Sequence, residues 1–226
     1  MTNSDKEEIL ILYGSQTGNS EAAAKQIAKL IPEKLSKCNA RDMQLDDFIE
    51  YEEAKWSRLV IIVTSSYGVG QAPLGCYRFR EFCDNILAKD GANKMLDGLT
   101  YAMLGLGDSK YTTFFQNPTA IDKALTMAGA TRLGPLGKAD ASGDQLEVID
   151  EWIDGIFSYL EKRVSIPTTE ESSDKLIIAQ SNTRTMCMQL FPHFFADSSD
   201  SGNNNAMMMG AIFVLVVAMI MMFMQS

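Results

Sequence analysis

The chain has 226 residues, 46% of them hydrophobic, which is enough to bury one core of about 150 residues and leave a further segment. Its net charge of -9 excludes a nucleic-acid partner, because phosphates would repel an acidic surface, and favours a protein partner with a basic docking face. His193 is the only histidine and the four cysteines lack C-x-x-C spacing. We therefore predict free thiols and no metal site.

Short apolar runs alternate with longer segments of helical periodicity, a pattern typical of a parallel sheet with crossover helices. Strands are expected at Ile9–Tyr13, Ala40–Leu45, Leu59–Thr64, Tyr101–Leu104 and Arg132–Leu136. Helices are expected at Ser20–Ile31, Tyr77–Ala88, Thr119–Ala128 and Leu146–Leu160. This predicts one α/β domain over residues 8–161, a doubly wound sheet of five parallel strands in the order 2-1-3-4-5. Residues 1–7 are polar and lack the apolar stretch of a signal peptide, so we expect a cytosolic domain.

After the predicted domain the composition changes. Residues 162–205 are rich in acidic, serine and asparagine side chains, and we predict a mostly flexible linker there. Within it, Leu176–Ile178 and Met186–Phe195 are apolar enough to dock on a surface that the sequence does not identify.

Residues 206–224 form a run of 19 residues without a charge. As a helix this run would span roughly 28 Å, close to the roughly 30 Å hydrocarbon core of a bilayer. We predict a single-pass C-terminal transmembrane helix that tethers the cytosolic domain, the alternative being a buried core helix. The lack of basic residues after the span favours the endoplasmic reticulum over the mitochondrial outer membrane.

The first strand runs into a loop rich in glycine and hydroxyl groups, Gly14–Ser20. Such a loop places free backbone N–H groups and the positive end of the next helix at one point, which suits a phosphate. Alternatively, Asn19 or Ser20 simply caps the helix. The loop lacks the lysine of a nucleoside-triphosphate site, and neither Gly68–Gly70 nor Gly105–Gly107 continues into G-x-G-x-x-G. These absences favour a phosphate monoester.

Two more loops follow the third and fourth strands. The second loop, Thr64–Pro73, and the third loop, Leu104–Phe114, each combine glycines with an aromatic residue, Tyr67 or Tyr111. In this strand order the first and third strands flank the crevice where doubly wound proteins bind ligands. Each tyrosine alone is compatible with an ordinary loop residue, but together they could enclose a planar ring by offset stacking.

Three stretches follow these strands in order: YGSQTGNSE, TSSYGVGQAP and LGLGDSKYTTF. They resemble the three FMN loops of the flavodoxin-like domain in diflavin reductases. That group comprises cytochrome P450 reductase, methionine synthase reductase and sulfite reductase flavoprotein. The resemblance implies that FMN is the cofactor, that Tyr67 and Tyr111 flank its ring, and that the Gly68 peptide meets flavin N5. The implied phosphate site consists of Ser15, Gln16, Thr17, Gly18, Asn19 and Ser20. The implied ring edge consists of Leu106, Gly107, Asp108 and Ser109. The remaining candidates are Ser65, Ser66, Gly70, Phe114 and Asp140, the last resembling the acidic residue that closes the site.

The resemblance also implies a carrier of single electrons, whose chemistry comes from the flavin and not from a catalytic acid or base. Nothing after residue 160 resembles an FAD- or NADPH-binding domain, so we do not expect a complete diflavin reductase. We expect a membrane-tethered flavoprotein that takes electrons from a separate FAD/NAD(P)H reductase and passes them to a haem, iron-sulfur or other redox protein. Two alternatives are a flavodoxin-fold NAD(P)H:quinone reductase and a flavodoxin-like module kept for protein interaction.

Overall fold

The computed structural model of the chain describes residues 6–90 and 92–195. The chain divides into two units, residues 1–191 and 192–226. In the second unit the structure describes a short 3-10 helix, Pro192–Phe194. The strands of the first unit are β1 (Glu7–Gly14), β2 (Cys38–Gln44), β3 (Leu59–Ser65), β4 (Thr100–Gly107), β5 (Thr131–Arg132) and β6 (Gly137–Asp140). Its helices are α1 (Asn19–Lys34), α2 (Leu45–Glu50), α3 (Tyr77–Ala88), α4 (Gln116–Met127), α5 (Gln145–Val164) and α6 (Glu170–Leu190).

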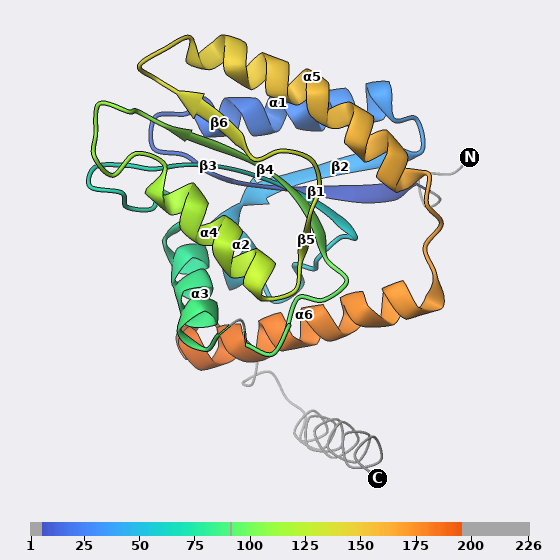
Figure 1. Cartoon of the computed structure of the whole chain (residues 1–226). Helices are drawn as coiled ribbons and strands as arrows, with labels where there is room; N and C mark the ends of the chain where they lie inside the picture. The colour runs from blue at the N-terminus through green and yellow to red at the C-terminus, as the bar shows by residue number, and fades with distance from the viewer. Residues whose placement is uncertain (1–5, 91, 196–226) are drawn as a thin grey trace. The chain divides into compact units, whose positions relative to one another are not determined.

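The strands form a parallel sheet in the order β2-β1-β3-β4-β5, which confirms the predicted order. Helices α1 and α5 cover one face of the sheet, and α2, α3 and α4 lie on the other (Figure 1). Every residue of β4 is buried, as is typical of a middle strand covered on both faces. Gly14 pairs with Thr64, and Thr64 pairs with Gly105, so the first three loops leave the sheet at one level.

The last position of the sheet is split between two short strands. β5 pairs with the beginning of β4, whereas β6 pairs with its end, from Leu104 to Gly107. The predictions of five strands and of one strand over Arg132–Leu136 were therefore wrong. Gly134 adopts a left-handed conformation with φ +71°, and Pro135 has no N–H group to donate to a neighbouring strand. The chain then re-enters the sheet as β6, beside the carboxyl end of β4.

The other element boundaries up to α5 lie close to the predictions, but the short helix α2, directly after β2, was not predicted. Helix α3 has the predicted limits, and β1, β3 and β4 each extend the predicted strand. Leu45, expected in the second strand, is instead the first residue of α2. This six-residue helix carries Asp46, whose carboxylate accepts hydrogen bonds from three backbone N–H groups at the start of α3.

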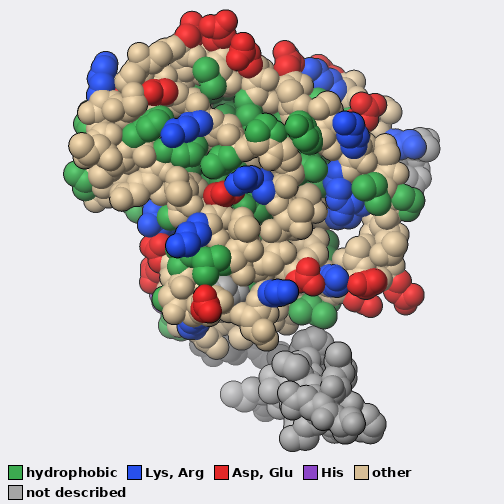
Figure 2. Space-filling model, viewed as in Figure 1, with side chains coloured by type: hydrophobic (Ala, Val, Ile, Leu, Met, Phe, Trp, Pro, Cys, Tyr) green, Lys and Arg blue, Asp and Glu red, His purple; other side chains and the backbone are tan. Residues whose placement is uncertain are grey.

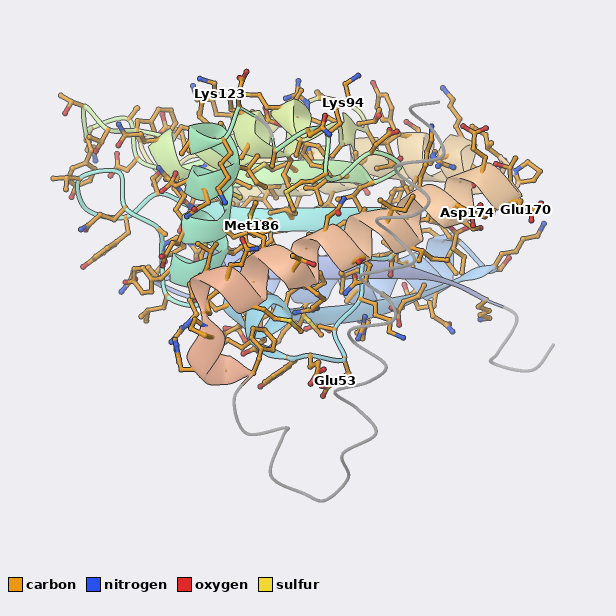
Figure 3. The ribbon with its side chains drawn as sticks, turned by 90° about the horizontal axis from the view of Figure 1, so that it is seen from below. Glu53, Lys94, Lys123, Glu170, Asp174 and Met186 are labelled. Atoms are coloured by element: carbon orange, nitrogen blue, oxygen red, sulfur yellow. The ribbon has the colours of Figure 1, made fainter. Side chains whose placement is uncertain are left out.

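The segment expected to be mostly a flexible linker contains α6. A capping box between Thr169 and Ser172 starts this helix, and Figure 3 shows it crossing the underside of the unit from Glu170 towards Met186. The Arg184 guanidinium donates to the backbone oxygens of Phe48, Ile49 and Ala54. The prediction of a flexible linker was therefore wrong for residues 170–190, because buried hydrogen bonds hold the helix.

The apolar pieces of that segment behave differently from one another. Met186, Cys187 and Phe191 are buried, but Ile177 and Ile178 are exposed. The predicted membrane anchor, residues 206–224, lies outside the described part of the chain. Within residues 6–90 and 92–195, no helix is both long enough and apolar enough to cross a membrane.

Candidate functional site

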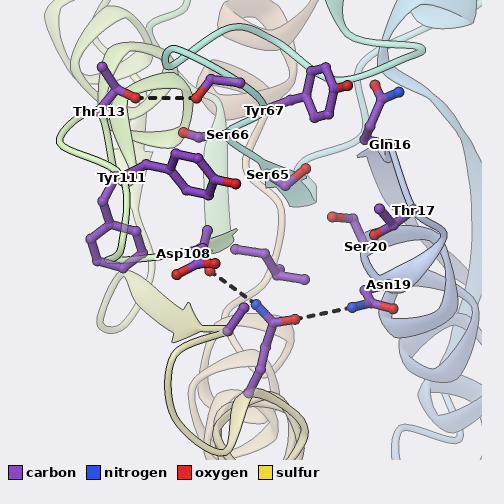
Figure 4. A pocket seen from close by; sticks show the side chains of 16 residues that line it. Gln16, Thr17, Asn19, Ser20, Ser65, Ser66, Tyr67, Asp108, Tyr111 and Thr113 are labelled. Atoms are coloured by element: carbon purple, nitrogen blue, oxygen red, sulfur yellow. Dashed lines mark hydrogen bonds between the residues drawn. The ribbon is translucent and has the colours of Figure 1, made fainter.

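The loops after β1, β3, β4 and β6 enclose a cavity of about 370 Å³ at the carboxyl edge of the sheet (Figure 4). Its lining is mostly polar uncharged side chains together with aromatic rings and glycines. The lining residues are Gln16, Thr17, Asn19, Ser20, Ser65, Ser66, Tyr67, Gly68, Leu106, Gly107, Asp108, Tyr111, Thr113, Phe114, Ala141 and Gln145. This set contains one carboxylate and no lysine or arginine.

The first loop presents an uncapped helix start to the cavity. Gly18 occupies the N-cap position of α1 with φ +95°, a conformation that favours glycine, and no side chain of the described residues caps this helix. The Ser15 hydroxyl accepts from the Gly18 N–H at 3.0 Å and so shapes the turn. Because Asn19 and Ser20 make no cap, the alternative interpretation of this loop as an ordinary capped helix start is not what the structure shows. A helix N-terminus beside hydroxyl groups suits an anion.

The second loop forms a tight turn that carries Tyr67. The backbone groups of Tyr67 and Gln71 exchange two hydrogen bonds, of 3.0 and 2.8 Å. Between them, Gly68 and Gly70 have φ values of +53° and +86°, which few residues other than glycine adopt. The turn leaves Tyr67 49% exposed at the cavity rim. The Gly68 carbonyl accepts from the Thr113 hydroxyl at 3.4 Å, which connects the second loop to the third.

The third loop and the loop after β6 brace each other through two carboxylates. Asp140 accepts from the backbone N–H groups of Ser109 and Ser142, both at 2.9 Å. The Ser109 side chain, followed by these two N–H groups, lowers the Asp140 pKa to about 2. Asp108 accepts from the Ser142 hydroxyl at 2.7 Å and from the Lys110 N–H at 3.0 Å, which lower its pKa in the same order. Both groups are therefore anionic at neutral pH.

Tyr111 lies in the third loop, which these hydrogen bonds hold in place, and its side chain is 59% exposed. Figure 4 shows its ring reaching into the space between the loops, with Tyr67 entering the same space from the second loop. Two exposed aromatic side chains from different loops at one cavity suit a flat ligand.

A buried amide supports the second loop from below. The Asn117 side chain is fully buried and donates to the Ser65 carbonyl at 3.0 Å and to the Thr64 hydroxyl at 3.3 Å. Its backbone N–H donates to the Ser66 hydroxyl at 3.0 Å, which leaves the Ser66 proton free for a ligand. Nearby, burial raises the pKa of the Cys76 thiol to about 12, so this cysteine stays neutral and does not act as a nucleophile.

The structure brings most of the predicted site residues together. The predicted residues that line the cavity are Gln16, Thr17, Asn19, Ser20, Ser65, Ser66, Tyr67, Gly68, Leu106, Gly107, Asp108, Tyr111 and Phe114. The predicted residues outside the lining are Ser15, Gly18, Gly70, Ser109 and Asp140. These five shape turns or brace neighbouring loops, as their conformations and hydrogen bonds show.

Three lining residues were not predicted from the sequence: Thr113, Ala141 and Gln145. Thr113 lies inside the third loop, and its hydroxyl group was a usable signal. Ala141 lies in the loop after β6, and Gln145 is the first residue of α5. Both become part of the site only because β6 pairs with the end of β4.

The sequence of this chain matches a known protein family. Residues 11–152 match the family model for flavodoxin. Methionine synthase reductase of Caenorhabditis elegans is 38% identical over 171 residues, which are 75% of this chain and 23% of that protein. NADPH–cytochrome P450 reductase of Saccharomyces cerevisiae is 34% identical over 168 residues, 74% of this chain and 23% of that protein. The chain thus spans less than a quarter of the length of these relatives.

Solved structures give the same fold. A flavodoxin of Streptococcus pneumoniae TIGR4 superimposes with a TM-score of 0.52 at 24% identity, over 69% of this chain and 99% of that one. Flavodoxin 1 of Bacillus cereus superimposes with a TM-score of 0.53 at 19% identity, over 69% of this chain and 98% of that one. Flavodoxins bind FMN at the crevice between β1 and β3, which is where this cavity lies. Since the family model covers more than half of its residues, the chain belongs to the flavodoxin family.

Proposed function

We propose that this chain binds FMN in the cavity and relays single electrons from a separate FAD- and NAD(P)H-dependent reductase to a redox protein at a membrane. The observation that carries the proposal is the convergence of an uncapped helix start and two exposed tyrosines, Tyr67 and Tyr111, on one cavity of about 370 Å³. That volume lies within the roughly 300–1,000 Å³ of small-molecule sites.

The two ends of the cavity suit the two ends of FMN. At one end, the N–H groups that start α1 and the hydroxyls of Thr17 and Ser20 are neutral donors for a phosphate monoester. At the other end, Tyr67 and Tyr111 provide faces for a planar ring, and the carboxylate of Asp108 opposes additional negative charge. When bound, FMN supplies the electron-transfer chemistry, while these side chains bind and orient it.

An acidic surface beside the cavity supports a basic protein partner. Helix α5 begins at the cavity with Gln145 and exposes acidic side chains along its length. These residues are Glu147, Asp150, Glu151, Asp154 and Glu161. Acidic side chains gather over α5 along the upper edge of Figure 2. Such a surface steers a basic partner towards the cavity and increases the rate of encounter.

The uncharged residues 206–224 support the membrane part of the proposal. A tether raises the local concentration of the domain around partners on the same membrane. The full chain should fractionate with membranes, and a variant carrying Val214→Asp and Val217→Asp should be released, because each carboxylate in the middle of a span costs about 3 kcal/mol. Equal partitioning of both proteins would contradict the tether.

The central test is FMN binding and reduction. The apoprotein should quench the fluorescence of FMN at a ratio of one to one, and the loaded protein should be reduced by NADPH only when an FAD-containing reductase is added. Absence of FMN binding would overturn the proposal. Steady NADPH oxidation by the isolated protein with a quinone would instead support a quinone reductase.

A further inference from the structure

Gln145, the first residue of α5, joins two sides of the cavity through its side-chain amide. Its Oε1 atom accepts a hydrogen bond from Asn19 Nδ2 at 3.1 Å. Its Nε2 atom donates to the backbone oxygens of Gly107 at 3.3 Å and Ala139 at 3.2 Å. Figure 4 shows the bond to Asn19 as a dashed line. Both N–H groups and the oxygen of the amide are therefore used.

The partners of Gln145 belong to two different segments that line the proposed FMN site. Asn19 is the first residue of α1, where the phosphate would bind. Gly107 ends β4, and Ala139 pairs with Leu106 in the β4–β6 ladder, where the ring edge would lie. One side chain thus links the start of α1, from the phosphate side, to the end of β4, from the ring side.

This link is not needed to pack α1 against α5. Further along the same two helices, Gln26 Nε2 donates to Asp150 Oδ1 at 2.9 Å, and Lys34 Nζ pairs with Asp154 Oδ1 at 2.8 Å. Neither pair lines the cavity. The helices are therefore held together without Gln145, and its distinct contribution is at the site.

We propose that Gln145 is a positioning residue that couples the phosphate and ring ends of the site and so increases the preference for FMN over riboflavin. This inference rests on the proposed function. A ligand that spans two loops gains the full contribution of each only when the loops are already held at its own spacing. Without the Gln145 link, the start of α1 is held less tightly to the end of β4, and the phosphate contributes less to binding.

The test compares FMN with riboflavin, which lacks the phosphate, as ligands of the apoprotein. In Gln145→Ala, the Kd for FMN should rise roughly tenfold, because the link between Asn19 and the end of β4 is lost, whereas the Kd for riboflavin should change less than about twofold. Gln26→Ala is the matched control, because it removes an amide link between the same helices away from the cavity. This control should change neither Kd by more than about twofold.

A second variant cuts the same link from its other side. Asn19→Ala should also lower the preference for FMN, and the double variant with Gln145→Ala should bind FMN no more than about twofold more weakly than the weaker single variant. Fully multiplicative effects, or an equal change for both ligands in Gln145→Ala, would overturn the inference. If the unmodified protein binds no FMN, the proposed function fails as well. If it binds FMN and Gln145→Ala binds equally well, only the role of Gln145 fails.

Discussion

Arg184 on α6 and Tyr111 in the third loop are large side chains of the same unit, yet Arg184 is 9% exposed and Tyr111 is 59% exposed. Arg184 is charged and buried, with backbone oxygens of three residues as acceptors. Tyr111 is aromatic and open to solvent at the cavity rim. The two regions thus reverse the usual preference for apolar residues inside and charged residues outside.

The reversal follows from what each region does. Around α6, most buried polar groups have partners: Trp56 Nε1 donates to the Thr183 hydroxyl at 2.8 Å, and the Gln180 amide pairs with the backbone of Ala54 and Trp56. Arg184 Nε is buried without a partner among the described residues. At the cavity, no side chain of the described residues caps α1, and Tyr67 and Tyr111 are exposed, so the helix start and the rings remain available to a ligand. Substitutions around α6 should therefore change stability, and substitutions at the cavity should change binding.

The largest expected effect is at Arg184. Methionine preserves the length of the side chain, but Arg184→Met leaves the carbonyls of Phe48, Ile49 and Ala54 without their donor. We expect the free energy of unfolding to fall by about 3 kcal/mol, since buried acceptors that lose a charged donor are costly. Urea denaturation of the apoprotein measures this change. The FMN Kd should stay within about twofold.

The control for Arg184 lies on the exposed side of the same helix. Lys175 pairs with Asp97 at 3.4 Å and with Glu171 at 3.1 Å. Because exposed ion pairs contribute at most about 1 kcal/mol, Lys175→Met should change the free energy of unfolding only slightly. Equal losses in the two variants would show that α6 is not held by its buried guanidinium.

The next largest effect is at Tyr111, where we expect a change in FMN binding and not in stability. Because this side chain is exposed, Tyr111→Ala should leave the free energy of unfolding of the apoprotein within about 0.5 kcal/mol. The loss of one stacking face should weaken FMN binding by about 2 kcal/mol, or roughly thirtyfold in Kd. Fluorescence titration measures the Kd, and Tyr111→Phe should preserve most of the affinity. An apoprotein destabilised as much as Arg184→Met would remove the distinction between the two regions.

The same difference explains how far the sequence could predict the molecule. The carboxyl-edge loops are local motifs: an apolar strand followed by glycines, hydroxyls and a tyrosine predicts its own position in a doubly wound sheet. Strand order and most of the cavity lining followed from them. Helix α6 carries no such local signal, because Gln180, Thr183 and Arg184 are polar residues whose partners lie more than 120 residues earlier in the chain.

That Gln145 lines the cavity was not predicted for a similar physical reason. Its hydrogen bond to Asn19 spans 126 residues, and its position at the cavity depends on β6 pairing with the end of β4. The sequence suggested one continuous last strand, whereas Gly134 and Pro135 divide it in two. A glutamine at a helix start has no special meaning until that division places it beside Gly107.

The smallest expected effect is at Asp140, whose carboxylate holds the third loop to the loop after β6. It tests whether the negative charge of Asp140 contributes to the free energy of unfolding. The Asp140 pKa is about 2 in the folded protein, chiefly because of Ser109, and an unfolded aspartate has a pKa near 3.9. A lowered folded pKa stabilises the protein above the unfolded pKa, and this stabilisation is lost as the pH falls towards the folded pKa. Urea unfolding should therefore show a constant difference between the unmodified protein and Asp140→Asn above about pH 5, shrinking between about pH 4 and pH 2. The same decline is expected when both proteins also carry Arg184→Met, because the two regions are separate and their contributions add. A difference that stays constant down to pH 2 would mean that Asp140 acts only through the geometry of its hydrogen bonds, which asparagine does not reproduce.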